Sequence, residues 1–91
     1  MIYMHCRIRV RDFVSWKAKM DADVQAQHDA GMYLKQFWRG IEDPNRAFFI
    51  MEIHSEEKAR AFLNPKDVAE SSKSAGVSEF EWYFVESIPV E

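Results

Sequence analysis

The stretch Met32-Tyr-Leu-Lys-Gln-Phe-Trp-Arg-Gly-Ile-Glu-Asp-Pro-Asn-Arg-Ala-Phe-Phe-Ile-Met-Glu-Ile-His54 decides how this chain folds. Its two arms are rich in aromatic and aliphatic residues, which suit the pleated and packed surface of a sheet. Asp43-Pro44-Asn45 separates the arms as a turn, because proline fixes φ and Asx side chains bond to their own backbone. The stretch therefore predicts two strands joined as a hairpin, with apolar side chains on both faces.

Two further strands are expected near the two ends of the chain. Every second residue of the segment 2–10 is apolar: Ile2, Met4, Cys6, Ile8 and Val10. This alternation predicts a strand with one core face. The segment 79–87 alternates in the same way and predicts the last strand, in which Phe80, Trp82 and Phe84 share one side.

Helical periodicity occupies the segment between the first strand and the hairpin. Mostly apolar residues recur there at three- and four-residue steps, which predicts one amphipathic helix of about five turns. The recurring residues are Phe13, Trp16, Met20, Val24 and His28. Asp12 is the expected N-cap of this helix, and Gly31 is expected to end it.

A second helical region is expected after the hairpin. Ser55 is its expected N-cap, and Ala59, Phe62 and Leu63 form its apolar stripe. After Asn64-Pro65, the segment 66–75 predicts a weaker helix that Gly76 ends. Its thin apolar stripe makes this segment a candidate lid.

The predicted elements together define a fold class. Their order is β-α-β-β-α-β, with an extra short helix before the final strand, which is the ferredoxin-like layout. The fold class is therefore α+β, with a four-stranded antiparallel sheet and helices on one face. The 91 residues are expected to form one domain spanning residues 1–91.

Such a sheet leaves one apolar face without cover. In the hairpin, Phe37 or Trp38 and Phe48 or Phe49 must face outward in either register. Exposed apolar patches of this kind usually mark interfaces, and a C2 dimer that pairs the two sheets is the simplest closure. We therefore expect a homodimer formed through the open sheet face.

Composition argues against several partners. The net charge is −3, from 12 basic and 15 acidic residues, and no basic run is interleaved with aromatics, so no nucleic-acid partner is expected. No apolar run approaches the ~20 residues of a membrane span, so no membrane association is expected. The single cysteine, Cys6, cannot form an internal disulfide, and this fits a cytoplasmic location. Cys6 is either a small buried hydrophobe or a nucleophile.

The three histidines are the best titratable candidates, because the free imidazole titrates near neutrality. His5 shares a strand face with arginines, His54 lies at a strand end, and His28 lies at the edge of the inner face of the first helix. No H-x-H or H-E-x-x-H spacing is present, so no metal site is expected. With three glycines and no glycine-rich phosphate-binding motif, the chain is expected to use no cofactor.

Several segments carry a resemblance to a known family. They are residues 11–17, Ala30-Gly31, Phe37-Trp38-Arg39 with Asp43-Pro44-Asn45, 58–62, Asn64-Pro65, 75–77 and 83–86. As a set they resemble the dimeric α/β-barrel superfamily, and within it the small stand-alone proteins similar to antibiotic-biosynthesis monooxygenases. The resemblance covers nearly the whole chain. The superfamily includes cofactor-free monooxygenases, lactone isomerases, haem enzymes and aldoxime dehydratases, so the fold alone selects no reaction.

The resemblance also implies where a ligand would bind. In such proteins the usual pocket lies between the helices and the helix-facing side of the sheet. By position, the implied ligand-binding residues are Met4, Cys6, Trp16, Met20, Val24, Trp38 and Trp82. No catalytic signature matches residue for residue, and His28 and Tyr33 are the candidate catalytic residues that could meet a pocket ligand as acid or base.

Two classes of function remain open from the sequence. The first is a cofactor-independent, monooxygenase-like enzyme that encloses a small apolar or aromatic molecule and supplies one acid–base group. The second is a non-catalytic dimer that binds a small molecule in the same cavity or serves a structural role. A pH-dependent rate that collapses in His28→Ala or Tyr33→Phe would distinguish the first class from the second.

Overall fold

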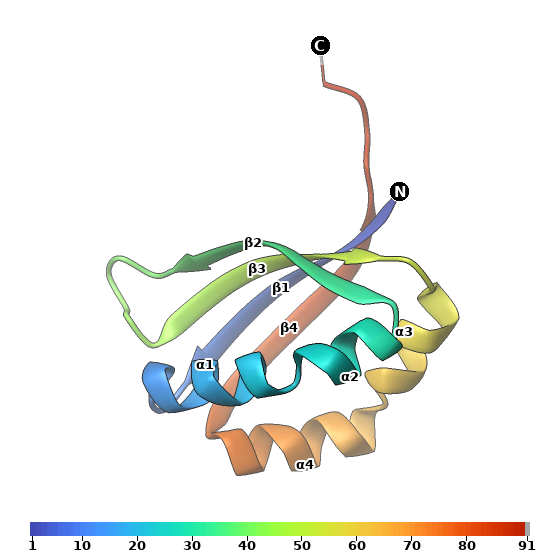
Figure 1. The fold of residues 1–91 in the computed structure, drawn as a ribbon. Helices are drawn as coiled ribbons and strands as arrows, with labels where there is room; N and C mark the ends of the chain where they lie inside the picture. The colour runs from blue at the N-terminus through green and yellow to red at the C-terminus, as the bar shows by residue number, and fades with distance from the viewer. Residues whose placement is uncertain (91) are drawn as a thin grey trace.

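Strands and helices follow one another in the order β-α-α-β-β-α-α-β in the computed structural model, which describes residues 1–90 (Figure 1). The first half of the chain contains β1 (Ile2–Val10), α1 (Phe13–Ala22), α2 (Val24–Asp29) and β2 (Met32–Arg39). The second half contains β3 (Arg46–Ile53), α3 (Glu56–Phe62), α4 (Pro65–Ala75) and β4 (Val77–Glu86). The last strand starts two residues earlier than the alternation alone predicts, directly after Gly76.

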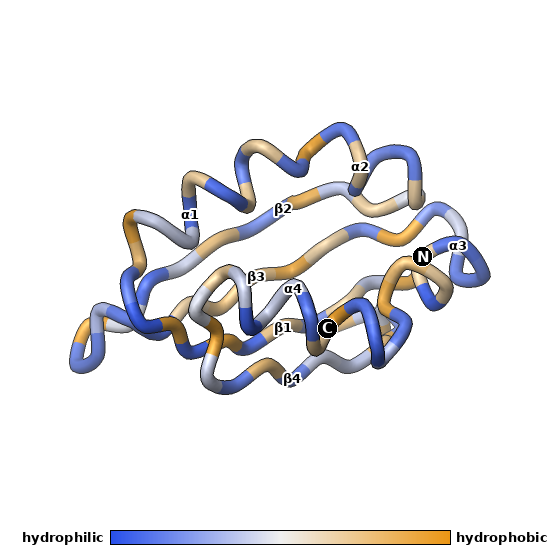
Figure 2. Tube along the Cα trace, turned by 90° about the horizontal axis from the view of Figure 1, so that it is seen from below, coloured by the Kyte–Doolittle hydropathy of each residue, from blue (hydrophilic) through white to orange (hydrophobic). Residues whose placement is uncertain are grey.

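The four strands form one antiparallel sheet in the order β2-β3-β1-β4. All the helices lie on the same side of this sheet (Figure 1). Seen from that side, α1 and α2 run beside β2, and α4 runs over the part of the sheet near β1 and β4 (Figure 2). The predicted α+β, ferredoxin-like layout is confirmed.

The central strand β1 determines which face of the sheet is buried. Met4, Cys6, Ile8 and Val10 are at most 4% exposed, whereas the alternate residues of the strand are exposed or half-buried. Their register partners on β3 also face the helices: Cys6 pairs with Phe49 and Met4 with Met51. The apolar residues that alternate in the sequence of β1 are therefore the ones that its buried face contributes to the core.

The edge strand β2 contains a β-bulge that reverses its side-chain alternation. Leu34 pairs with Met51 and Gln36 with Ile50, so Lys35 is the additional residue. Beyond this bulge Phe37 pairs with the buried Phe49 and faces the helices. Phe37 and Phe49 stack with centroids 5.8 Å apart, and Trp16 of α1 stacks on Phe37 at 6.0 Å. This aromatic cluster ties the first helix to the hairpin.

The predicted single helix over residues 13–28 is wrong, because the chain breaks it at Asp23 into α1 and α2. The Asp23 amide donates to both Lys19 O and Met20 O, which tightens the last turn of α1. Asp23 then occupies the N-cap position of α2, and its carbonyl accepts from Gln27 N at 3.0 Å. Aspartate competes with the helix by favouring caps and turns, which explains the break.

The two predicted N-cap residues, Ser55 and Asp12, both occupy the expected position, but only one of them bonds to a helix amide. Ser55 accepts from Lys58 N at 3.2 Å and caps α3 as predicted. Asp12 occupies the N-cap position of α1, but its carboxylate accepts from Ser15 Oγ at 2.8 Å and not from a helix amide. The Asn45 side chain accepts from Phe13 N, so the hairpin turn contacts the amide end of α1.

No helix within residues 1–90 combines the length and apolar character that a membrane crossing requires.

Gly31 and Gly76 both have φ of +73°, where a β-carbon is unfavourable. A Cβ on Gly31 would meet Ser55 N at 3.0 Å, whereas a Cβ on Gly76 would meet only the Arg11 side chain, at 3.3 Å. We expect Gly31→Ala to lower the free energy of unfolding by about 2–3 kcal/mol and Gly76→Ala by about 1–2 kcal/mol. Urea denaturation of both variants measures the difference, and equal losses would contradict the backbone clash at Gly31.

Candidate functional site

A cavity of about 660 Å³ lies between the sheet and the helices. Its apolar floor comes from all four strands and contains Met4, Ile8, Met32, Phe49, Met51, Val77 and Phe80. Its apolar walls come mainly from the helices and contain Trp16, Met20, Phe62, Leu63, Val68 and Ala75. This volume falls within the roughly 300–1,000 Å³ of small-molecule sites, which are mostly apolar with a few polar groups.

The polar residues of the cavity gather on the helices. The α1–α2 side contributes Lys19, Asp23 and Gln27, and α4 contributes Asp67, Glu70 and the serines at 71, 72 and 74. Lys19 Nζ donates to the carbonyl oxygen of Ser74 at 2.8 Å, which joins α1 to the last turn of α4. The cavity therefore has an apolar base and a charged rim.

Three of the residues predicted to contact a ligand line this cavity: Met4, Trp16 and Met20. Cys6, Val24, Trp38 and Trp82 lie outside its lining. Cys6 is fully buried between its register partners Phe49 and Trp82, and burial raises the pKa of its thiol, so it behaves as a packed hydrophobe. Trp82 packs against the core beside Cys6 and against Phe80, at 4.8 Å between ring centroids, and does not reach the cavity.

The positions of Val24 and Trp38 follow from irregularities of the backbone. The bulge in β2 places Trp38 on the sheet face opposite the cavity, where it pairs with Phe48 and is 46% exposed. The break at Asp23 leaves Val24 exposed at the start of α2. Gln27, an interruption of the apolar stripe in the sequence, takes the cavity-facing position instead.

His28 and Tyr33 lie together, but outside the cavity lining. Their rings stack with centroids 4.4 Å apart, and the centroid of the His54 ring also lies 4.4 Å from that of Tyr33. His54 Nε2 is 2.6 Å from a carboxylate oxygen of Glu52, and Lys35 Nζ is 3.6 Å from its second oxygen. Two histidines far apart in the sequence thus meet on one tyrosine at the start of β2.

The charges around Glu52 keep that carboxylate ionised. The hydrogen bond with His54 lowers the pKa of Glu52 below its usual value, and the positive charge of Lys35 acts in the same direction. The ionised carboxylate can therefore accept a hydrogen bond from the His54 ring and orient it. Within residues 1–90 no three His, Cys, Asp or Glu side chains are grouped so that they could hold a metal ion.

The sheet face opposite the helices carries an apolar patch. Phe48, Ile50 and Tyr3 are half-buried there, while Trp38 and Tyr83 are 46% and 51% exposed. We call these five residues the open-face patch. Trp38 pairs directly with Phe48, whereas the exposed His5 lies between Ile50 and Tyr83 and pairs with both. The helices cover the other face of the sheet and leave this one open (Figure 1).

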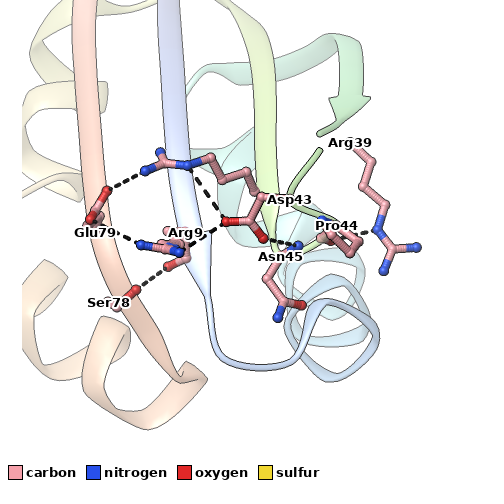
Figure 3. Close-up of polar contacts among 8 residues, drawn as sticks. Arg9, Arg39, Asp43, Pro44, Asn45, Ser78 and Glu79 are labelled. Carbon is pink, nitrogen blue, oxygen red and sulfur yellow. Dashed lines mark hydrogen bonds and ion pairs between the residues drawn. The ribbon is translucent and has the colours of Figure 1, made fainter. Parts of the chain in front are cut away.

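A charged network flanks the open-face patch where β1, β3 and β4 meet the hairpin turn (Figure 3). Arg9 lies 3.2 Å from Asp43 and 3.9 Å from Glu79. Arg46 bridges the same two carboxylates at 3.9 and 3.2 Å. Two arginines and two carboxylates thus balance each other, and the Asp43 side chain also accepts from Asn45 N to form the turn.

Comparison with solved structures identifies the fold. A candidate antibiotic biosynthesis monooxygenase from Bordetella bronchiseptica matches with a TM-score of 0.74 and 17% identity, over 97% of each chain. A protein named antibiotic biosynthesis monooxygenase matches with a TM-score of 0.68 and 10% identity, over 98% of this chain and 100% of its own. A candidate antibiotic biosynthesis monooxygenase from Deinococcus radiodurans matches with a TM-score of 0.67 and 11% identity, over 100% of this chain and 96% of its own.

These likenesses confirm the resemblance at the level of the fold: the chain shares its ferredoxin-like α+β layout with the matching structures. No family model matches the sequence, and no curated protein matches it either. Because the identities are 10–17%, the comparison concerns the fold and leaves the chemistry to the residues of this chain.

Sequence reasoning missed the charged rim of the cavity. Asp23, Asp67 and Glu70 belong to segments with weak or interrupted apolar stripes, so periodicity did not mark them as cavity residues. The available signal was the polar interruption of a helical stripe, as at Gln27, combined with a serine-rich helix that has little apolar surface to bury.

Proposed function

We propose that this protein is a homodimer that binds a small apolar or aromatic molecule in the cavity between its sheet and its helices. The observation that carries the proposal is the cavity itself, with about 660 Å³ above a floor of methionine, isoleucine and phenylalanine side chains. Methionine suits such a site because its flexible, polarisable side chain adapts to ligands of irregular shape. Trp16, which lines the cavity, offers a ring surface for an aromatic ligand.

The open-face patch supports the dimer. Trp38 and Tyr83 are half-exposed aromatic residues on the two edge strands of this face, β2 and β4, and such residues dominate the energetics of protein interfaces. The segment after β4 leaves the domain on the same side (Figure 1), and Ile88 and Val90 are exposed on it. A second copy placed on this face would remove these apolar side chains from water.

An enzymatic role is the second candidate, and the names of the matching structures favour it. A cofactor-independent oxygenation would need a substrate that ionises easily and one group to take its proton. His28 and Tyr33 remain the predicted acid–base pair. Their stacked rings lie near His54, which contacts the Glu52 carboxylate, so four titratable side chains come together in the fold. The lone Cys6 thiol fits the cytoplasmic location that the sequence predicts.

A cavity-filling substitution tests ligand binding. Val68 lines the cavity on α4, and Val68→Trp is expected to fill it and weaken binding of naphthylmethanol by about tenfold or more. Val14→Trp is the matched control, because Val14 lies on α1, is 72% exposed and does not line the cavity. Fluorescence titration measures both affinities. Equal binding by the two variants, or no binding by the wild type, would overturn the cavity as a ligand site.

A charge placed in the open-face patch tests the dimer. Trp38→Glu is expected to convert a dimer into a monomer, because a carboxylate buried at an interface without a partner is strongly unfavourable. Ile41→Glu is the control, since Ile41 lies at the hairpin tip and is 99% exposed. Native mass spectrometry reports the mass of each species. A monomeric wild-type protein, or a dimer that persists in Trp38→Glu, would contradict an interface on this face.

Oxygen consumption tests the second candidate. If the protein oxygenates an electron-rich aromatic such as a dihydroxynaphthalene, oxygen uptake should exceed that of buffer and should be lost in Val68→Trp. The acid–base assignment predicts that the rate of oxygen uptake falls by about 10²-fold in His28→Ala and in Tyr33→Phe, while the dimer persists. Full activity in both variants would remove this pair from the mechanism, and uptake at the buffer rate would leave ligand binding as the function.

A further inference from the structure

The charges on the rim of the cavity are distributed unevenly. Three carboxylates, those of Asp23, Asp67 and Glu70, share the rim with a single ammonium group, that of Lys19. The lining therefore carries a net charge of −2 when these groups are ionised. Its floor and walls hold no charged group, so the rim alone sets the electrostatic preference of the site.

The one cation of the rim is already engaged. Lys19 Nζ donates to the Ser74 carbonyl oxygen at 2.8 Å, near the C-terminal end of α4. Asp67 lies seven residues earlier on the same helix, which corresponds to about 10 Å along its axis. The positive charge thus lies toward one end of the cavity, and the acidic residues of α4 lie toward the other.

The rim carboxylates lack a basic partner, unlike the five carboxylates that form ion pairs elsewhere within residues 1–90. Elsewhere, Asp21 pairs with Lys17, Glu56 with Arg60, and Glu79 with Arg9 and Arg46. Within residues 1–90, Asp23, Asp67 and Glu70 take part in no ion pair. A ligand that brings a positive charge to this rim would meet carboxylates that no protein group neutralises.

We infer that the cavity selects an organic cation: an apolar or aromatic body that fills the space above Met4 and Phe49, with a protonated amine that lies at the rim beside Asp67, Glu70 and Asp23. This inference rests on the proposed ligand-binding function and gives it a chemical class. A ligand that ends in a carboxylate meets three like charges at the same rim and is disfavoured. An uncharged ligand of the same shape binds with intermediate affinity.

Three probes with one ring system and different end groups test this selectivity: naphthylmethylamine, naphthylmethanol and naphthoate. At neutral pH and low salt we expect the amine to bind about three- to tenfold more tightly than the alcohol, and the carboxylate to bind more weakly than the alcohol by a similar factor. Fluorescence titration gives the three affinities. Added salt should narrow the differences, because it screens charges at an open rim.

The double variant Asp67→Asn, Glu70→Gln should reduce the preference for the amine over the alcohol to less than about twofold, with binding of the alcohol retained. The matched control is Glu42→Gln, Glu57→Gln, which changes the net charge by the same amount. Both of its residues are exposed, lie outside the cavity lining and form no ion pair within residues 1–90. Glu57 also lies in the first turn of its helix, as Asp67 does.

The outcomes separate the two proposals. Tight binding of the alcohol without a preference for the amine overturns the selectivity and leaves ligand binding intact. Loss of the preference in the control variant to the same extent as in the rim variant assigns it to net charge and also overturns the rim site. Failure of all three probes to bind the wild type overturns ligand binding, and the selectivity with it.

Discussion

Pairing of β1 on both of its sides is the constraint on which the rest of this structure depends. The strand has β3 on one edge and β4 on the other, so its alternation is imposed on three of the four strands. A shift by one residue would expose Met4, Cys6, Ile8 and Val10 and bury arginines in their place. The cost of that exchange locks the register, and the register determines which face the helices cover.

One-sided coverage then creates both surfaces that bear on function. On the covered face, the break at Asp23 and the separate path of α4 leave space above the sheet that the core side chains do not fill. On the open face, the patch containing Trp38 and Tyr83 remains in contact with water. The cavity and the interface are therefore two consequences of covering a two-faced apolar sheet from one side only.

The edge strand β2 is where local irregularity has the largest effect. The bulge at Lys35 turns Phe37 into the core, where it stacks with Trp16 and Phe49, and turns Trp38 outward. Aromatic pairs of this kind contribute about 0.5–1.5 kcal/mol each beyond their burial, which favours this register over the unbulged one. The same region holds the stack of His28, Tyr33 and His54, which joins the end of α2 to the ends of β2 and β3.

Much of the fold could be predicted from the sequence, because its signals are local. Alternation located β1 to the residue, the Asp43-Pro44-Asn45 turn located the hairpin, and Ser55 marked the start of α3. The layout on one face of the sheet followed from the order of these elements. Of the ligand-binding residues implied by the resemblance, Met4, Trp16 and Met20 lie at the cavity, each on a regular part of its strand or helix.

The tertiary structure alone decided what the irregular positions do. A bulge is defined by the register between two paired strands. The sequence of β2 by itself therefore could not reveal that Trp38 faces away from the cavity. The charged rim likewise arises from helices that are distant in sequence, with Asp23 on one side and Asp67 and Glu70 on the other. The sequence by itself determined the elements and the face of each regular strand, since those depend on neighbours along the chain. The cavity, its charge and the exposed patch depend on neighbours in space, and only the folded structure brings those together.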